Sequence, residues 1–155
     1  MRRVAWLLLA GLSLIGCGGS PASPSADAPV RVTIMPLPTF AGNPNTAAFT
    51  ATVANVTSGT VDLTFPSSCQ LLPYFVDRRT GQAVTPAGGG TACAAVITHL
   101  SLVPSLSMSQ VFMVKAGTAP EPTAIVLPPG EYGIYARLED QQYRVQSPQI
   151  VFTLK

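Results

Sequence analysis

The side chains that could carry chemistry are few in this chain of 155 residues: three cysteines and a single histidine, His99. No Asp or Glu lies near His99 in the sequence, and no Gly-x-Ser-x-Gly elbow accompanies it. A Ser–His–Asp set therefore has no local support, although one assembled in space from distant segments stays an alternative. Gly88-Gly89-Gly90 lacks the Lys-Ser/Thr that follows the glycines of a phosphate-binding loop. We therefore predict no catalytic residues and no cofactor, and expect that the chain is not an enzyme.

Three methionines, Met35, Met108 and Met113, could form a soft copper site together with His99. In a strand, however, Met108 and Met113 differ by five positions and would face opposite sides. Methionine more often fills gaps in a core, so we predict packing roles and no metal site.

Cys17 follows a segment typical of an export signal. Arg2 and Arg3 give a positive start, and the uncharged run from Val4 to Gly16 suits a signal peptide but is too short to span a bilayer. The four residues Leu14-Ile15-Gly16-Cys17 resemble the lipobox of bacterial lipoproteins. The alternatives are an ordinary signal peptide that is cut elsewhere, or a buried apolar segment.

The lipobox resemblance implies that residues 1–16 are removed and that the thiol of Cys17 carries a diacylglyceryl group. The protein would then be anchored by lipid in the bacterial cell envelope. The residue after the cysteine is Gly18 and not Asp, which implies the outer membrane in a bacterium with two membranes.

An acylated Cys17 leaves Cys69 and Cys93 as a pair. In an oxidising compartment a disulfide between them is the default, and on the chain-entropy model it would stabilise the fold by about 3 to 4 kcal/mol. A metal site is the alternative, but it lacks the usual CxxC spacing and a nearby histidine.

Charge and composition narrow the choice of partner. Arg2 and Arg3 account for two of the nine Lys and Arg residues, so the remaining seven balance the seven Asp and Glu residues. A neutral chain lacks the basic surface that nucleic acid requires. Residues 18–29 contain no large apolar side chain, so we expect residues 17–29 to form the lipidated cysteine and a flexible linker.

From residue 30 onward, apolar and polar residues alternate in short runs separated by Gly, Pro and Asn. The predicted strands are Val30–Ile34, Ala47–Val53, Val61–Phe65, Leu72–Asp77, Ala95–Val103, Met108–Lys115, Tyr132–Leu138 and Ile150–Leu154. The second and third are expected to form a hairpin. About seven to eight short strands and no amphipathic helix predict one domain, residues 30–155, with an immunoglobulin-like antiparallel β-sandwich fold.

Two features of this domain suggest specific roles. The run Pro128-Pro129-Gly130-Glu131-Tyr132 resembles a tyrosine corner, in which a phenol bonds to upstream backbone. The long loop from Arg78 to Cys93, with Arg78 and Arg79, is the candidate site for binding a protein partner. The alternative is that this loop is only a connector.

Residues from about 49 to 154 also resemble the bacterial intracellular proteinase inhibitor (BsuPI-like) family. The resemblance rests on Val53-Ala54-Asn55, Val61-Asp62-Leu63-Thr64-Phe65-Pro66-Ser67, Tyr74-Phe75-Val76-Asp77 with Gly81, Leu102-Val103-Pro104 and Leu127-Pro128-Pro129-Gly130-Glu131-Tyr132. The Gly-rich segment with Cys93 stands where the family has a stretch containing Trp. The resemblance implies an immunoglobulin-like sandwich that inhibits a protease. We expect a non-catalytic binding domain at the cell envelope, whose protein partner is a protease or another envelope protein. The alternative function is a structural or adhesion-type scaffold in an envelope complex.

Overall fold

The computed structural model describes residues 28–37 and 45–155. The predictions for the signal peptide, for acylation of Cys17 and for most of the linker lie outside these residues. The described chain contains ten strands and no helix, so none of its segments is a helix able to span a bilayer. The all-β prediction is confirmed.

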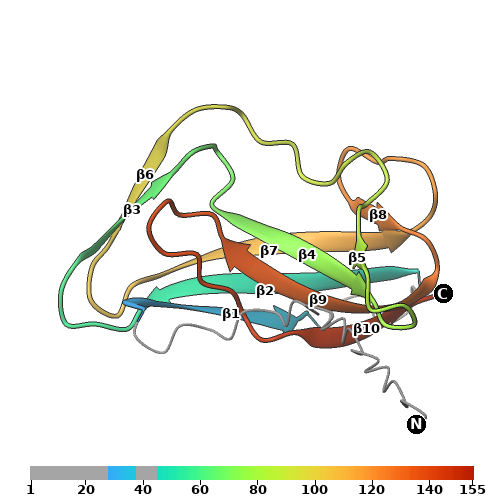
Figure 1. Ribbon diagram of the computed structural model, residues 1–155, viewed down its shortest axis with the longest axis horizontal. Coiled ribbons are helices and arrows are strands. Elements are labelled where there is room, and N and C mark those ends of the chain that lie inside the picture. Colours follow the sequence, from blue (N-terminus) through green and yellow to red (C-terminus); the bar gives the residue numbers. More distant parts are fainter. Residues whose placement is uncertain (1–27, 38–44) are drawn as a thin grey trace, which may run out of the picture.

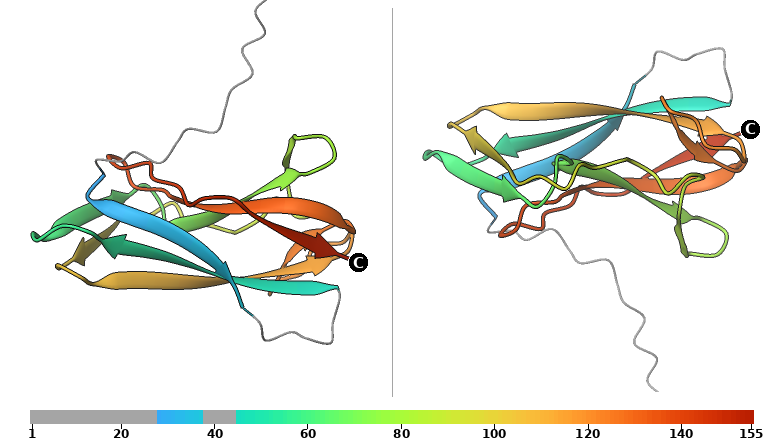
Figure 2. Two further views of the ribbon diagram at one scale, coloured as in Figure 1. Left: turned by 90° about the horizontal axis from the view of Figure 1, so that it is seen from below. Right: turned by 90° about the horizontal axis from the view of Figure 1, so that it is seen from above.

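Two four-stranded sheets pack face to face as a sandwich (Figures 1 and 2). The first has the order β1 (Val30–Pro36), β2 (Thr46–Asn55), β7 (Ser107–Ala116), β8 (Ile125–Leu127). The second has the order β10 (Ile150–Leu154), β9 (Gly130–Leu138), β4 (Leu71–Asp77), β5 (Ala83–Val84). A separate pair, β3 (Val61–Phe65) and β6 (Thr98–Leu102), extends one end of the molecule. All neighbouring strands are antiparallel except β7 and β8.

Alternation of apolar residues builds the core between the sheets. The apolar residues that alternate along β9 are all buried: Tyr132, Ile134, Ala136 and Leu138. Aromatic rings join the two sheets, since Phe152 of β10 lies 4.9 Å from Phe49 of β2 and 6.4 Å from Phe75 of β4, measured between ring centroids. The sandwich is therefore held by apolar contact between its inner faces.

The predicted tyrosine corner is present at the start of β9. The hydroxyl of Tyr132 donates a hydrogen bond of 2.8 Å to the carbonyl of Pro128. This bond fixes the connection from β8 in the first sheet to β9 in the second, so Tyr132 has the structural role expected from the sequence.

The predicted hairpin between β2 and β3 is wrong. β2 pairs with β1 and β7, whereas β3 pairs with β6. The buried side chain of Asn55 explains the change of partner, because its amide donates to the carbonyls of Gly59 and Leu102, each at 2.7 Å. These bonds carry the chain away from β2 and towards β6.

Three further details differ from the sequence-based expectations. The apolar centre of β7, residues 111–114, predicts a strand that is central in its sheet or covered on both sides; β7 is central, but its outer face is uncovered, since Val111 is 56% exposed. The strand expected over residues 95–103 begins only at Thr98. The short strands β5 and β8 were not predicted, because two or three residues are too few to show a period.

Candidate functional site

The segment from Arg78 to Cys93, the candidate binding loop, begins with a tight turn at the end of β4. The carboxylate of Asp77 accepts hydrogen bonds from the amides of Arg79, at 2.7 Å, and Thr80, at 3.0 Å. The amide of Thr80 in particular holds the pKa of Asp77 below its ordinary value. Gly81 completes the turn with a φ of 71°, which glycine adopts without strain. The turn therefore presents Arg78 and Arg79 in a fixed, exposed position.

The middle of the binding loop crosses from one sheet to the other. Val84 of β5 pairs with Phe75 of β4, and three residues later the amide of Ala87 donates to the carbonyl of Val126 in β8, at 2.9 Å. Gly88 then lies so close to Pro120 that a Cβ at this glycine would come within 2.8 Å of the Pro120 Cβ. The loop thus closes the side of the sandwich between β4 and β8 (Figure 1).

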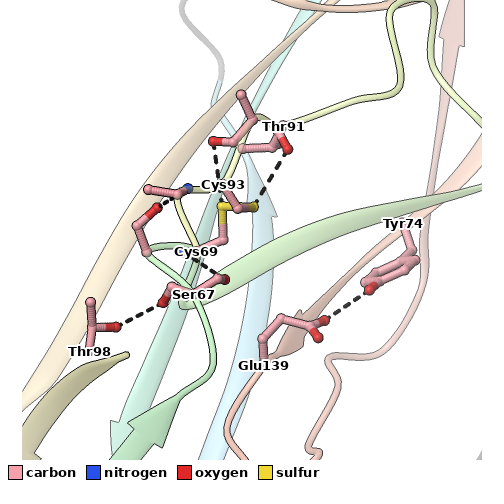
Figure 3. The surroundings of a disulfide bond; sticks show 10 residues. Ser67, Cys69, Tyr74, Thr91, Cys93, Thr98 and Glu139 are labelled. Atoms are coloured by element: carbon pink, nitrogen blue, oxygen red, sulfur yellow. Dashed lines mark hydrogen bonds between the residues drawn. A yellow bond between two sulfur atoms is a disulfide. The ribbon is translucent and has the colours of Figure 1, made fainter. Parts of the chain in front are cut away.

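The far end of the loop is held by the predicted disulfide between Cys69 and Cys93 (Figure 3). Next to it, Ser68 and Ala94 are joined twice: the Ser68 amide donates to the Ala94 carbonyl at 3.0 Å, and the Ala94 amide donates to the Ser68 hydroxyl at 2.9 Å. The loop is consequently fixed at its start, middle and end.

Two of the three hollows that border the binding loop contain candidate binding residues. The first, the tyrosine groove, has a volume of about 380 Å³ and lies between residues 83–91 and the outer residues Tyr74 and Tyr135. The second, the arginine hollow, has a volume of about 590 Å³ and lies between Arg78 and Arg79 on one side and residues 128–132 on the other. The sequence-predicted residues Arg78 and Arg79 therefore line a concave surface.

A cluster of polar and aromatic side chains forms one wall of the tyrosine groove. The rings of Tyr74 and Tyr135 stack with centroids 5.4 Å apart, and the guanidinium carbon of Arg137 lies 4.2 Å from the centre of the Tyr74 ring. Glu139 accepts hydrogen bonds from the Tyr74 hydroxyl at 2.9 Å and from Arg137 Nε at 2.8 Å, and Arg137 Nη2 also donates to the Tyr74 hydroxyl. These bonds hold the Tyr74 ring in one orientation.

The surroundings of Tyr74 in this cluster change the pKa of its hydroxyl. Burial raises the pKa of Tyr74 to about 12, and the hydrogen bond to Glu139 and the negative charge of Glu139 act in the same direction. Tyr74 is therefore a neutral hydrogen-bonding phenol at physiological pH.

Sequence reasoning did not find this cluster. Tyr135, Arg137 and Glu139 share one face by their spacing of two, which was the available signal. Their partner Tyr74 could not be assigned, because its position opposite Tyr135 depends on the register of β4 with β9.

The other residues considered from the sequence do not line the tyrosine groove or the arginine hollow. His99 is exposed on β6, with its Nδ1 atom 3.2 Å from the Thr64 hydroxyl. The expectation of core packing holds only for Met108, since Met35 and Met113 are exposed on the outer face of the first sheet. Within residues 28–37 and 45–155, no three His, Cys, Asp or Glu residues lie close enough to hold a metal ion.

Comparison with known proteins adds little to this geometry. No protein-family model and no curated protein matches the sequence. Among solved structures, the chain is similar to a β-glucosidase from Erythrobacter marinus (14% identity, TM-score 0.42, covering 81% of this chain and 16% of that one). It is also similar to β-glucosidases from Thermotoga neapolitana (11%, 0.43, 81% and 16%) and Listeria innocua in complex with laminaribiose (10%, 0.44, 93% and 20%).

These matches correct one expectation. The chain was expected not to be an enzyme, whereas the solved chains that it resembles are named as β-glucosidases, so that expectation is withdrawn. The chain spans only 16 to 20% of the length of those proteins. At these identities and TM-scores, neither an activity nor a substrate is transferred to this chain.

Proposed function

We propose that the protein is a lipid-anchored module of the bacterial cell envelope that binds a protein partner through the binding loop, residues 78–93. The observation that carries this proposal is the way the loop is held. Asp77 caps its first turn, Ala87 bonds to β8 and the Cys69–Cys93 disulfide ends it, so that a surface with two hollows is built in advance. A preorganised surface loses less entropy on binding than a mobile one.

The proposed location rests on two independent supports. The sequence Leu14-Ile15-Gly16-Cys17 resembles a lipobox, and the disulfide suits an oxidising compartment outside the cytoplasm. We propose that residues 1–16 are removed, that Cys17 carries lipid and that residues 30–155 form one immunoglobulin-like domain. In a bacterium with two membranes the outer membrane is the proposed destination.

The chemistry of the two hollows suggests what the partner presents. The tyrosine groove is lined mainly by apolar and aromatic residues and suits an apolar side chain. The arginine hollow is lined by Arg78 and Arg79, whose exposed guanidinium groups suit a carboxylate, and also by Glu131 and by Asp77, whose carboxylate is bonded to the turn. The proposed partner segment therefore carries an acidic residue near an apolar one.

Mutation of the two arginines of the arginine hollow tests whether the binding loop binds the partner in the cell envelope. Arg78→Ala with Arg79→Ala should reduce cross-linking of the full chain to its partner by about tenfold or more, because loss of two charged contacts removes a large part of the binding energy. Arg144→Ala, which changes an exposed arginine outside the loop, is the matched control. Equal cross-linking of both variants would reject the loop as the binding site.

The resemblance to the proteinase inhibitor family proposes a protease as the partner. If the loop binds a protease cleft, the full chain should slow a subtilisin-like enzyme at a near-stoichiometric ratio and remain uncut. Rapid cleavage without inhibition would reject the inhibitor role and favour the scaffold role. The exposed side chains of Met35, Val111 and Met113 on the outer face of the first sheet offer a scaffold a second contact surface.

A further inference from the structure

Three aliphatic side chains are exposed together at one end of the molecule, and we call them the apolar tip. They are Val56 at 48% exposure, Val103 at 49% and Leu106 at 49%. They belong to the β2–β3 and β6–β7 turns, which lie side by side at one end of Figure 1. The two turns, residues 56–60 and 103–106, contain no charged residue. An apolar, uncharged patch of this kind is a candidate contact surface.

The apolar tip is held on a rigid frame. The backbone amide of Asn55 donates to the Leu106 carbonyl at 3.1 Å, and its side chain bonds both to Gly59 in one turn and to Leu102 beside the other. The second turn is closed by a bond of 3.0 Å from the Leu106 amide to the Val103 carbonyl. The exposed side chains therefore cannot withdraw into the core by a simple change of the turns.

The chain enters the domain at this same end. The amide of Val56 donates to the carbonyl of Pro29 at 3.0 Å, and Val30 lies opposite Asn55 in the β1–β2 ladder. From Ala28 back to Cys17 the chain can span at most about 40 Å, because an extended residue covers about 3.6 Å. β2 runs away from this end for about 34 Å at 3.4 Å per residue. The apolar tip thus lies at the end where the chain enters the domain, within the reach of the residue that carries the proposed anchor.

We infer that the apolar tip docks on the phospholipid surface in which Cys17 is anchored; this inference rests on the proposed lipid anchor. Three half-exposed side chains are too few to bind a bilayer on their own. A short linker raises their effective concentration at the surface, so weak apolar contact suffices once the chain is anchored. Because the tip is uncharged, docking depends on the apolar region of the lipid and not on anionic headgroups.

A tryptophan reporter tests the docking. The only tryptophan is Trp6, within the proposed signal peptide, so the processed chain would have no background tryptophan emission. The full chain carrying Val103→Trp is produced with its anchor and reconstituted in phosphatidylcholine vesicles. Acyl chains brominated near the headgroup should quench its fluorescence by about twofold or more, since interfacial side chains reach the headgroup–acyl boundary. Adding anionic lipid should not change the quenching.

The matched control is Val151→Trp. Val151 is 53% exposed, close to the 49% of Val103, but it belongs to β10, outside the tip. Its fluorescence should not be quenched. Quenching of both reporters, or of neither, in chains that float with the vesicles would overturn the docking and leave the anchor intact. If mass spectrometry found no acyl groups on Cys17, the proposed anchor would be wrong, and the docking inference would fail with it.

The unmodified sequence supplies a second measurement that does not depend on how the tryptophan variants fold. Vesicles should slow amide hydrogen exchange in residues 56–60 and 103–107 and leave exchange in the Arg78–Gly81 turn unchanged. Equal exchange at the tip with and without vesicles, in chains shown to be anchored, would overturn the docking.

Discussion

At the scale of single residues, Glu139 joins two side chains of the second sheet, Tyr74 and Arg137. It accepts a hydrogen bond from the Tyr74 hydroxyl, and burial together with this bond raises the pKa of Tyr74 to about 12. A phenol whose pKa is raised on folding favours the folded state at neutral pH. That contribution is lost as the pH rises from the ordinary value of about 10 towards the folded value.

Glu139→Gln should lower the pKa of Tyr74 from about 12 towards the ordinary range, because the negative charge and the strong acceptor are both removed. Titration of tyrosine absorbance at alkaline pH measures this shift. Glu131→Gln, at the other end of β9, is the control and should leave the late-titrating tyrosine in place. An unchanged titration in Glu139→Gln would show that Glu139 does not control Tyr74.

Tyr132→Phe should lower the free energy of unfolding by about 1 kcal/mol, because it removes one hydrogen bond and keeps the ring. Urea unfolding measures the change. The comparison variant is Tyr135→Phe, whose hydroxyl makes no hydrogen bond within the part of the chain that the structure describes. A smaller loss for Tyr132→Phe than for Tyr135→Phe would contradict the structural role of the tyrosine corner.

At the scale of elements, the binding loop depends on two neighbouring glycines that differ in one respect. Gly88 and Gly89 have φ values of 80° and 86°, but only Gly88 contacts Pro120. Any side chain at either position carries backbone strain of about 1 to 2 kcal/mol.

Gly88→Ala should therefore destabilise the protein more than Gly89→Ala, by about 1 kcal/mol or more, because its Cβ would overlap the proline ring. Urea unfolding of the two variants gives the difference directly. Binding of the partner should also weaken in Gly88→Ala, since the loop must move off residue 120. Equal stability of the two variants would mean that the loop does not pack against Pro120.

The same scale shows what could be predicted from the sequence. Period-two alternation located the long strands and the inward residues of β9, because burial of one face imposes that period. Alternation could not show which strands pair with each other. It predicted a hairpin of β2 and β3, whereas the buried side-chain amide of Asn55 bonds to the carbonyls of Gly59 and Leu102 and directs β3 towards β6. The arginines of the binding loop were predicted from exposure and charge, whereas the Tyr74 cluster requires the register of β4 with β9.

At the scale of the whole molecule, the Cys69–Cys93 disulfide holds the end of the loop that bonds to β8 through Ala87. Cys69→Ala with Cys93→Ala should lower the free energy of unfolding by about 3 to 4 kcal/mol, because the unfolded chain regains the entropy of a closed loop. Urea unfolding with and without reductant provides the comparison. If reductant left the midpoint of the parent protein unchanged, the disulfide would have no part in its stability.

The positions of the two outermost strands determine how the molecule would respond to a pulling force. β1 begins at one end of the sandwich and β10 finishes at the opposite end, in different sheets (Figure 1). A load applied between Pro29 and Lys155 would run along the strands, so the backbone bonds of the seven β1–β2 residue pairs would be strained together in shear and not broken one after another. This geometry suits a domain that must stay folded while one end is fixed and the other is under tension.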